Sequence, residues 1–210
     1  MAYSDFTLKQ VKSQFKLKTI ENSSLFSDIK TLELSDHLEK TLKRNVPLAL
    51  AINTEKARSE LIIINILLEV KAKFDDQISL FSGIEFNVDR EQGLNGFCDY
   101  IISLSAEQLY LEVPLIIIIE AKNENIIAGV GQCIATMYAA KAYNEKENKS
   151  VPCIYGTVTT GVEWKFITLT SNSVYIDNQS YYVSDTQKIL GILVNMVAQK
   201  NASSKINTSD

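Results

Sequence analysis

The stretch LIIIIEAK, residues 115–122, decides the fold of this chain. Its unbroken apolar run predicts a strand that is buried on both faces at the centre of a sheet. Because side chains alternate along a strand, Glu120 and Lys122 are expected on the same face, where the strand ends. A carboxylate and an ammonium group are costly to keep in such an apolar setting, which indicates that they have a purpose there.

Further elements are expected on both sides of this strand, from hydrophobic periodicity and turn signals. Strands are predicted at 78–88, 97–104, 151–159 and 162–170, a short hairpin at 174–176 and 181–183, and helices at 126–144 and 185–199. Gly129 and Gly131 in the first of these helices are expected to permit close backbone packing. The order of elements predicts an α/β architecture, with a mixed central β-sheet flanked by helices.

The stretch TEKARSELIIINILLEVK, residues 54–71, is predicted to form a buried helix. Thr54 is a suitable N-cap, and Glu55 suits the positive end of the helix dipole. The apolar residues lie almost all round such a helix. A helix start followed by a core strand is the alternative, because short apolar runs rich in isoleucine also favour strands.

Length and composition predict one main domain, since 210 residues with 46% hydrophobic residues suit a single core. Residues 1–50 are expected to form a helical and irregular extension packed on that core. A helix is predicted there from Ser35 or Asp36 to about Arg44, with Pro47 breaking the chain after it. Residues 51–200 form the predicted core domain, and residues 201–210 are expected to be a disordered tail.

Charge and cysteine content narrow the function classes. The net charge of −4 argues against tight, non-specific binding of nucleic acid. The three cysteines have no C-x-x-C spacing, so neither a zinc site nor a disulfide framework is expected. Without a signal peptide or an apolar run of about 20 residues, a cytoplasmic location away from membranes is expected.

Two further carboxylates join Glu120 and Lys122 as candidate site residues. Asp99 lies in a neighbouring predicted strand, and Glu60 lies within the predicted buried helix. Charged residues are rarely buried unless they are paired or bind metal, so this set predicts a Mg²⁺ site, for which Mn²⁺ would substitute. Asp99, Glu120 and the backbone carbonyl of Ala121 would be ligands, and Glu60 would bind directly or through water. Such a site would hydrolyse a phosphodiester bond, with Lys122 orienting the attacking water.

The pattern Glu60, Asp99, Glu120-x-Lys122 resembles the signature of the PD-(D/E)XK nucleases, which include restriction endonucleases and the nuclease domain of type I restriction subunits. Cys98 stands where a proline often precedes the first acidic residue of the motif. The resemblance covers about residues 54–170. It implies a restriction endonuclease-like three-layer fold for residues 51–200.

Many members of that superfamily also carry a glutamine on the helix after the core strand. Gln132, ten residues after Lys122, matches that position and is therefore a candidate catalytic residue. A tyrosine commonly follows four residues later, but Thr136 stands there in this chain and Tyr138 lies two residues further on.

The resemblance implies a Mg²⁺-dependent DNA endonuclease, and cutting both strands of a duplex would suit a homodimer. The alternative is a module that keeps the nuclease fold without catalysis and binds nucleic acid or a protein partner, which the acidic net charge keeps open. Hydrolysis of RNA is a third interpretation.

The site residues also have structural interpretations. Glu120 and Lys122 could form a salt bridge at a sheet edge, Asp99 could be a carboxylate near a turn, and Gln132 could bond to the backbone.

Glu60 is the least constrained of the acidic candidates. It could pair with Lys56 or Arg58 as an ordinary helix carboxylate. In that case Glu55 or Glu69 would supply the third carboxylate.

Overall fold

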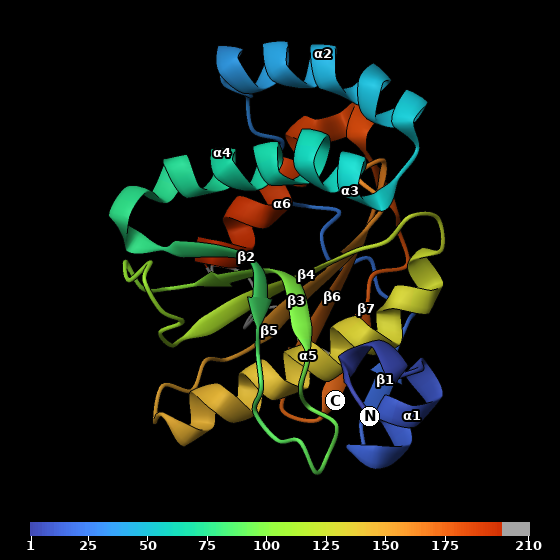
Figure 1. The fold of residues 1–210 in the computed structure, drawn as a ribbon, viewed down its shortest axis with the longest axis vertical. Helices are drawn as coiled ribbons and strands as arrows, with labels where there is room; N and C mark the ends of the chain where they lie inside the picture. The colour runs from blue at the N-terminus through green and yellow to red at the C-terminus, as the bar shows by residue number, and fades with distance from the viewer. Residues whose placement is uncertain (199–210) are drawn as a thin grey trace.

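The computed structural model describes residues 1–198 and has an eight-stranded mixed sheet at its centre (Figure 1). Helices cover both faces of this sheet, so the predicted α/β architecture is confirmed. The order across the sheet is β1-β7-β6-β5-β4-β3-β2, and β8 pairs with β6. The strands are β1 (Lys18–Ile20), β2 (Ser79–Glu85), β3 (Phe97–Ser103), β4 (Leu115–Ala121), β5 (Ile154–Thr159), β6 (Glu163–Thr170), β7 (Ser173–Ile176) and β8 (Tyr181–Tyr182). The predicted tail at 201–210 lies outside the described residues.

The helices form a layer on each face of the sheet. Figure 1 shows α2, α4 and α6 on one side, and α1 and α5 on the other. The α-helices are α1 (Leu8–Gln14), α2 (Asp36–Ile52), α3 (Glu55–Arg58), α4 (Ile64–Phe74), α5 (Ile126–Lys146) and α6 (Thr186–Ala198). Short helical turns are η1 (Tyr3–Asp5), η2 (Ser59–Ile63), η3 (Asp75–Gln77) and η4 (Val183–Asp185). Within residues 1–198, every helix is too short or too polar to cross a membrane.

The strand β4 is central, as the sequence predicts. All of its residues from Leu115 to Ala121 are buried. It pairs antiparallel with β3 on one side and parallel with β5 on the other, which makes the sheet mixed. β4 is therefore not an edge strand, but the ion pair of the structural alternative does form, because Lys122 Nζ lies 2.6 Å from Glu120 Oε1.

The segment 54–71 is helical throughout, so the alternative of a core strand is wrong. Thr54 caps it, since its hydroxyl accepts a hydrogen bond from the backbone N–H of Ala57 at 3.1 Å. One π-helical turn, η2, joins α3 to α4. The helix is buried on one side rather than all round: Ile66 and Leu67 are fully buried, whereas Leu68 is 50% exposed.

Pro47 does not break the chain, contrary to prediction, because α2 continues through it to Ile52. Ser35 caps this helix by accepting a hydrogen bond from the N–H of Leu38 at 3.1 Å. A proline costs one helical hydrogen bond, but the helix buries residues on both sides of it, from Leu38 to Ala49, and Pro47 itself is exposed. Packing of the helix on the core outweighs the local penalty.

The predicted hairpin at 174–176 and 181–183 is also wrong. Both segments pair with β6 instead of with each other, since β7 pairs with Ile167–Thr170 and β8 with Glu163 and Trp164. Because β6 has eight residues, β8 can pair with its start and β7 with its end, one after the other on the same side. A short strand that the sequence did not indicate, β1, then extends the sheet in parallel beyond β7.

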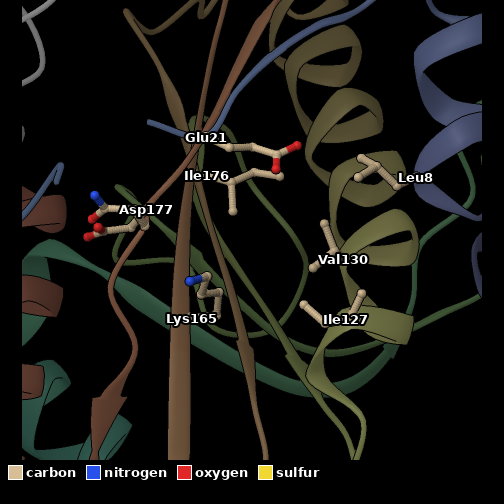
Figure 2. A pocket seen from close by; sticks show the side chains of 8 residues that line it. Leu8, Glu21, Ile127, Val130, Lys165, Ile176 and Asp177 are labelled. Atoms are coloured by element: carbon tan, nitrogen blue, oxygen red, sulfur yellow. The ribbon is translucent and has the colours of Figure 1, made fainter. Parts of the chain in front are cut away.

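The glycines at the start of α5 bring neighbouring segments into close contact, as expected. A Cβ atom on Gly131 would lie 2.4 Å from the carbonyl oxygen of Phe6, in the segment that leads into α1. Leu8 reaches from α1 toward α5 beside this contact (Figure 2). The rings of Phe15 and Tyr138 stack with their centroids 4.3 Å apart, so Tyr138 serves this helix interface.

We expect Gly131→Ala to destabilise the protein by about 1–3 kcal/mol, because the added methyl group would overlap backbone atoms that cannot rotate away. Urea unfolding measures the change. The matched control is Lys146→Ala at the exposed end of the same helix, for which a change within about 0.5 kcal/mol is expected. Equal stabilities of the two variants would contradict the packing described.

Candidate functional site

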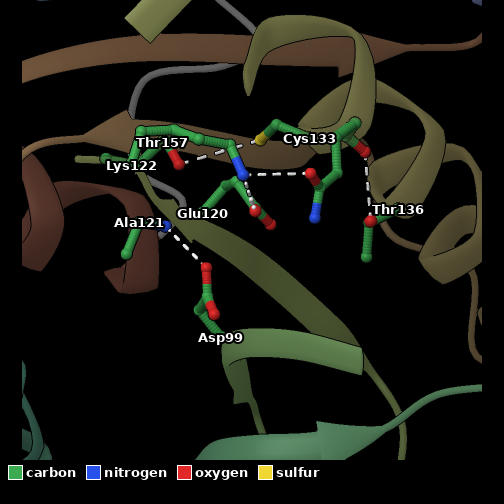
Figure 3. Close-up of polar contacts among 8 residues, drawn as sticks. Asp99, Glu120, Ala121, Lys122, Cys133, Thr136 and Thr157 are labelled. Atoms are coloured by element: carbon green, nitrogen blue, oxygen red, sulfur yellow. Dashed lines mark hydrogen bonds and ion pairs between the residues drawn. The ribbon is translucent and has the colours of Figure 1, made fainter. Parts of the chain in front are cut away.

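The candidate site lies where β3 and β4 separate. Their pairing ends at Tyr100 and Ile119, although β4 runs on beside β5 as far as Ala121. The backbone N–H of Ala121 points toward the gap that opens between the two strands. Asp99 fills this gap, and its Oδ2 atom accepts a hydrogen bond from the Ala121 N–H at 2.7 Å (Figure 3). The carboxylate of Asp99 therefore replaces the strand partner that Ala121 has lost.

Glu120, Lys122 and Gln132 form a hydrogen-bonded group beside this gap. Figure 3 labels Glu120 and Lys122 of this group. The Nζ atom of Lys122 donates to Glu120 Oε1 at 2.6 Å and to Gln132 Oε1 at 3.0 Å. Gln132 comes from α5, so the group joins the end of β4 to that helix. The side-chain oxygen of Gln132 is thus bonded to Lys122.

Gly129 makes room for the lysine. A Cβ atom at this position would lie 2.7 Å from Cγ1 of Val158 and 3.0 Å from Cε of Lys122. The first turn of α5 can therefore rest directly on the Lys122 stem, which limits the positions that the ammonium group can take.

Glu120 is an unusual carboxyl group, because it is only 3% exposed and lies next to Asp99. The pKa of Glu120 is raised from 4.5 to about 8, first by burial and then by the charge of Asp99 and a hydrogen bond between the two side chains. Lys122 opposes this shift without cancelling it. Two adjacent carboxyl groups in such a place must share a proton or a cation.

Lys122 stays charged in these surroundings. Burial alone would lower the pKa of its ammonium group, but the negative charges of Glu120, Asp99 and Glu55 outweigh burial, and the net shift is upward. The site thus combines a permanent positive charge with a carboxyl pair that resists carrying two negative charges.

Glu60 stands apart from this group. Its side chain is 65% exposed and lies 3.8 Å from the ammonium group of Lys56, which is the ordinary helix pairing. It lines a cleft of about 330 Å³ together with Asp99 and Ala121, on the side of the sheet covered by α3 and η2. The structure therefore brings Asp99, Glu120, Lys122 and Gln132 together, with Glu60 across an open cleft from them.

Glu69 and Glu55, the two other candidates for the third carboxylate, differ in what they contact. Glu69 accepts hydrogen bonds from the backbone and hydroxyl of Ser35, at 3.1 and 2.7 Å, and so belongs to the start of α2. Glu55 lines the cleft and raises the pKa of Lys122 through its charge. Glu55 is therefore the glutamate on α3 that acts on the lysine.

Sequence reasoning missed the residues that tie α3 and η2 to this site. The hydroxyl groups of Tyr100 and Ser59 lie 2.5 Å apart, and the Tyr100 hydroxyl also donates to the Ser59 carbonyl at 3.2 Å. Arg58 donates to the side chain of Asn53 at 2.5 Å and to the backbone carbonyl of Asn123, the residue after Lys122. The π-helical turn that directs Ser59 toward the strands has no signature in the sequence.

The oxygen atoms around the gap suit a hard divalent cation. Asp99, Glu120 and the Ala121 carbonyl offer the oxygen ligands that Mg²⁺ prefers. A protein usually binds Mg²⁺ through one or two carboxylates, and water fills the other positions. A cation between Asp99 and Glu120 would also replace the proton that their proximity requires. Within residues 1–198, no three Asp, Glu, His or Cys side chains already stand close enough to hold a metal. The fit therefore rests on the carboxyl pair and the main chain.

Comparison with known proteins assigns the chain to no family. The chain matches no protein-family model, and no curated protein matches its sequence. The resemblance to PD-(D/E)XK nucleases consequently rests on the sequence pattern of Glu60, Asp99, Glu120 and Lys122.

We expect Glu120→Gln to remove a pH dependence of stability in metal-free buffer. The folded protein holds the Glu120 proton more tightly than the unfolded chain does, because the pKa of Glu120 is raised to about 8. The stability that this group contributes is therefore complete below about pH 4.5 and is lost as the pH rises through about 8. Over that range the wild type should lose up to about 1.4 kcal/mol per pH unit relative to Glu120→Gln.

Urea unfolding in EDTA at half-unit pH steps measures this difference. The matched control is Glu91→Gln, which changes an exposed carboxylate in the loop between β2 and β3 and should keep the wild-type slope. A wild type and a Glu120→Gln variant with parallel pH profiles would show that Glu120 is not held protonated.

Proposed function

We propose that this chain is a divalent-metal-dependent endonuclease with a restriction endonuclease-like fold, which hydrolyses phosphodiester bonds in DNA. The adjacent buried carboxyl groups of Asp99 and Glu120, beside the ammonium group of Lys122, carry this proposal. Hydrolysis of an anionic diester requires neutralisation of charge and a positioned water, and this group of residues is suited to both.

Asp99, Glu120 and the backbone carbonyl of Ala121 would hold Mg²⁺ or Mn²⁺ in this site. When bound, the cation would polarise a phosphate oxygen and acidify a water molecule. Asp99 accepts from the Ala121 N–H through Oδ2, and its hydrogen bond with Glu120 would be replaced when both carboxylates hold the cation. Glu120 would bind in its ionised form, which the cation favours over the proton.

Lys122 has the geometry to act on the attacking water. An ammonium group has three N–H donors, and Glu120 and Gln132 occupy two of them. The third donor is left for a water molecule or a phosphate oxygen. Gln132 then acts as a positioning residue, since its contact with the reaction runs through Lys122.

The cleft beside Asp99 provides the approach for the substrate. Glu60 would reach a cation there through water, and Glu55 tunes the charge of Lys122. Tyr100 and Ser59 fix the π-helical turn that carries Glu60, so the cleft wall has a defined position relative to the carboxyl pair.

We expect Lys122→Met and Asp99→Asn each to lower the rate of plasmid cleavage in Mg²⁺ or Mn²⁺ by about 100-fold or more, because the first removes a positive charge that acts on the reacting phosphate and the second removes a charged ligand of the cation. Supercoiled DNA and an RNA of the same sequence are the substrates, and gel electrophoresis measures the rate. The control Lys56→Met, which removes the exposed lysine beside Glu60, should keep most of the activity.

Cleavage that survives both Lys122→Met and Asp99→Asn would contradict the proposed site. Faster cleavage of the RNA would change the substrate and keep the mechanism. Binding of DNA without any cleavage by the wild type would favour the alternative of a catalytically silent nuclease-fold module.

We also expect variants of the metal ligands and of the lysine to differ in their affinity for Mn²⁺. Asp99→Asn and Glu120→Gln should weaken Mn²⁺ binding by at least about tenfold, because each replaces a charged oxygen ligand by an amide. Lys122→Met should bind Mn²⁺ at least as tightly as the wild type, since it removes a competing positive charge. Isothermal titration calorimetry measures these affinities, and a wild type that binds no Mn²⁺ would contradict the metal dependence.

A further inference from the structure

The second half of α2 presents an apolar surface. Residues 45–54 include no charged side chain, and Leu48, Leu50 and Ile52 are 50%, 43% and 48% exposed. Figure 1 shows α2 at the outer edge of the molecule, beyond α4. Single exposed apolar residues are common on protein surfaces, but half-exposed ones that follow one another this closely form a patch of the kind that marks an interface.

Arg44, Leu48 and Ile52 form a stripe along α2. They recur at every fourth position, so they lie on one face of the helix. All of them are exposed, and they lie beside the side of α2 that packs on the core. The α2 residues buried in the core are Leu38, Leu42, Asn45 and Ala49. The stripe therefore consists of a cation followed by two half-exposed aliphatic side chains.

The charges along α2 suit a second copy of the same helix that runs in the opposite direction. The C-terminal end of a helix carries partial negative charge and is stabilised by a nearby cation, but the last turn of α2 has no basic residue. If two α2 helices pack antiparallel across a two-fold axis at Leu48, Arg44 of each copy comes opposite Ile52 of the other, because both lie four residues from Leu48. Each helix end then gains the cation that it lacks, and the Leu48 side chains pack on each other.

The end of α2 is also tied to the candidate site. Asn53 follows α2, and its side chain accepts a hydrogen bond from Arg58 at 2.5 Å. Arg58 donates in turn to the backbone carbonyl of Asn123, next to Lys122. Glu55, which lines the cleft, comes only three residues after Ile52. An interface on this half of α2 would therefore lie close to the cleft of each copy.

We propose that α2 is the interface of a homodimer, in which the stripe of Arg44, Leu48 and Ile52 packs antiparallel against the same stripe of a second copy. A two-fold interface of this kind is self-complementary. So short a helix pair covers less than the roughly 800 Å² per partner of a standard interface, so we expect a weak dimer with a Kd of about 10 µM. The interface is argued from the exposure and charge of α2 alone. Its consequence, that two clefts near one axis cut both strands of a duplex, rests on the proposed function.

Sedimentation equilibrium of the whole chain in EDTA, at about 1 to 200 µM protein, tests this interface, and the mean mass should rise toward that of two chains. Leu48→Lys should weaken association at least about tenfold, because it puts two ammonium groups at the two-fold axis in place of two apolar side chains. The matched control Leu109→Lys should leave association unchanged, since it alters a leucine that is 95% exposed in the loop between β3 and β4. Arg44→Glu should weaken association about threefold to tenfold, because it sets a carboxylate against the negative end of the partner helix, and Lys146→Glu on α5 should not.

Cross-linking tests the antiparallel orientation without a change of charge in the apolar patch. Cys98, Cys133 and Cys153 are all buried, so a thiol introduced on the surface reacts first. Leu48→Cys should form a covalent dimer on mild oxidation, and Leu109→Cys should not. A mixture of Arg44→Cys and Ile52→Cys chains should form more covalent dimer than either variant alone, because these two positions meet only in an antiparallel pair.

The outcomes separate the interface from the proposed reaction. A wild type that stays monomeric throughout, or equal association of Leu48→Lys and Leu109→Lys, overturns the interface whether or not the wild type cleaves DNA. Ile52→Cys chains that cross-link better alone than in the mixture also overturn it, since the helices would then run parallel. A dimer with the expected cross-links in a protein that never cleaves DNA supports the interface and rejects the nuclease. In an active protein, Leu48→Lys should change the first product of plasmid cleavage from linear to nicked DNA, and an unchanged product overturns the consequence for DNA alone.

Discussion

The separation of β3 from β4 after Tyr100 and Ile119 is the constraint on which the site depends. It leaves the Ala121 N–H without a strand partner, and buried backbone donors are rarely left unpaired. Asp99 satisfies this donor and is thereby held against Glu120. The same backbone feature thus ends the ladder, fixes one carboxylate and forces it into the neighbourhood of another. Lys122 offsets only part of the negative charge of Asp99 and Glu120, so a proton or a cation would stabilise the carboxyl pair further.

Helices hold this arrangement from both faces of the sheet. On one face, α5 rests on the Lys122 stem at Gly129 and supplies Gln132 as a second acceptor for the ammonium group. On the other face, Tyr100 bonds twice to Ser59 and so fixes η2 against β3. The site is therefore held from both faces of the sheet, and a cleft opens beside Asp99.

The sequence predicts the centre of this structure better than its periphery. The apolar run before Glu120 requires a central strand, and alternation then brings Glu120 and Lys122 to one face without any knowledge of distant residues. The helix α2 continues through Pro47 because it packs against the core, and local helix propensity carries no information about that packing. The exposure of Glu60 depends on the π-helical turn η2, because one extra residue rotates a helix face. Which strand β7 and β8 join depends likewise on the length of β6.

The acidic net charge of −4 bears directly on how such a site would bind an anionic strand. The overall field repels nucleic acid, so affinity has to come from local cations acting at short range, within about 8 Å at physiological salt. Lys122 offers one charge, but it is already shared with Glu120. A divalent cation between the carboxyl groups would then contribute to binding as well as to chemistry. Under the proposed function, an acidic protein with this carboxyl pair would bind nucleic acid poorly without metal, and would gain its affinity and its activity together.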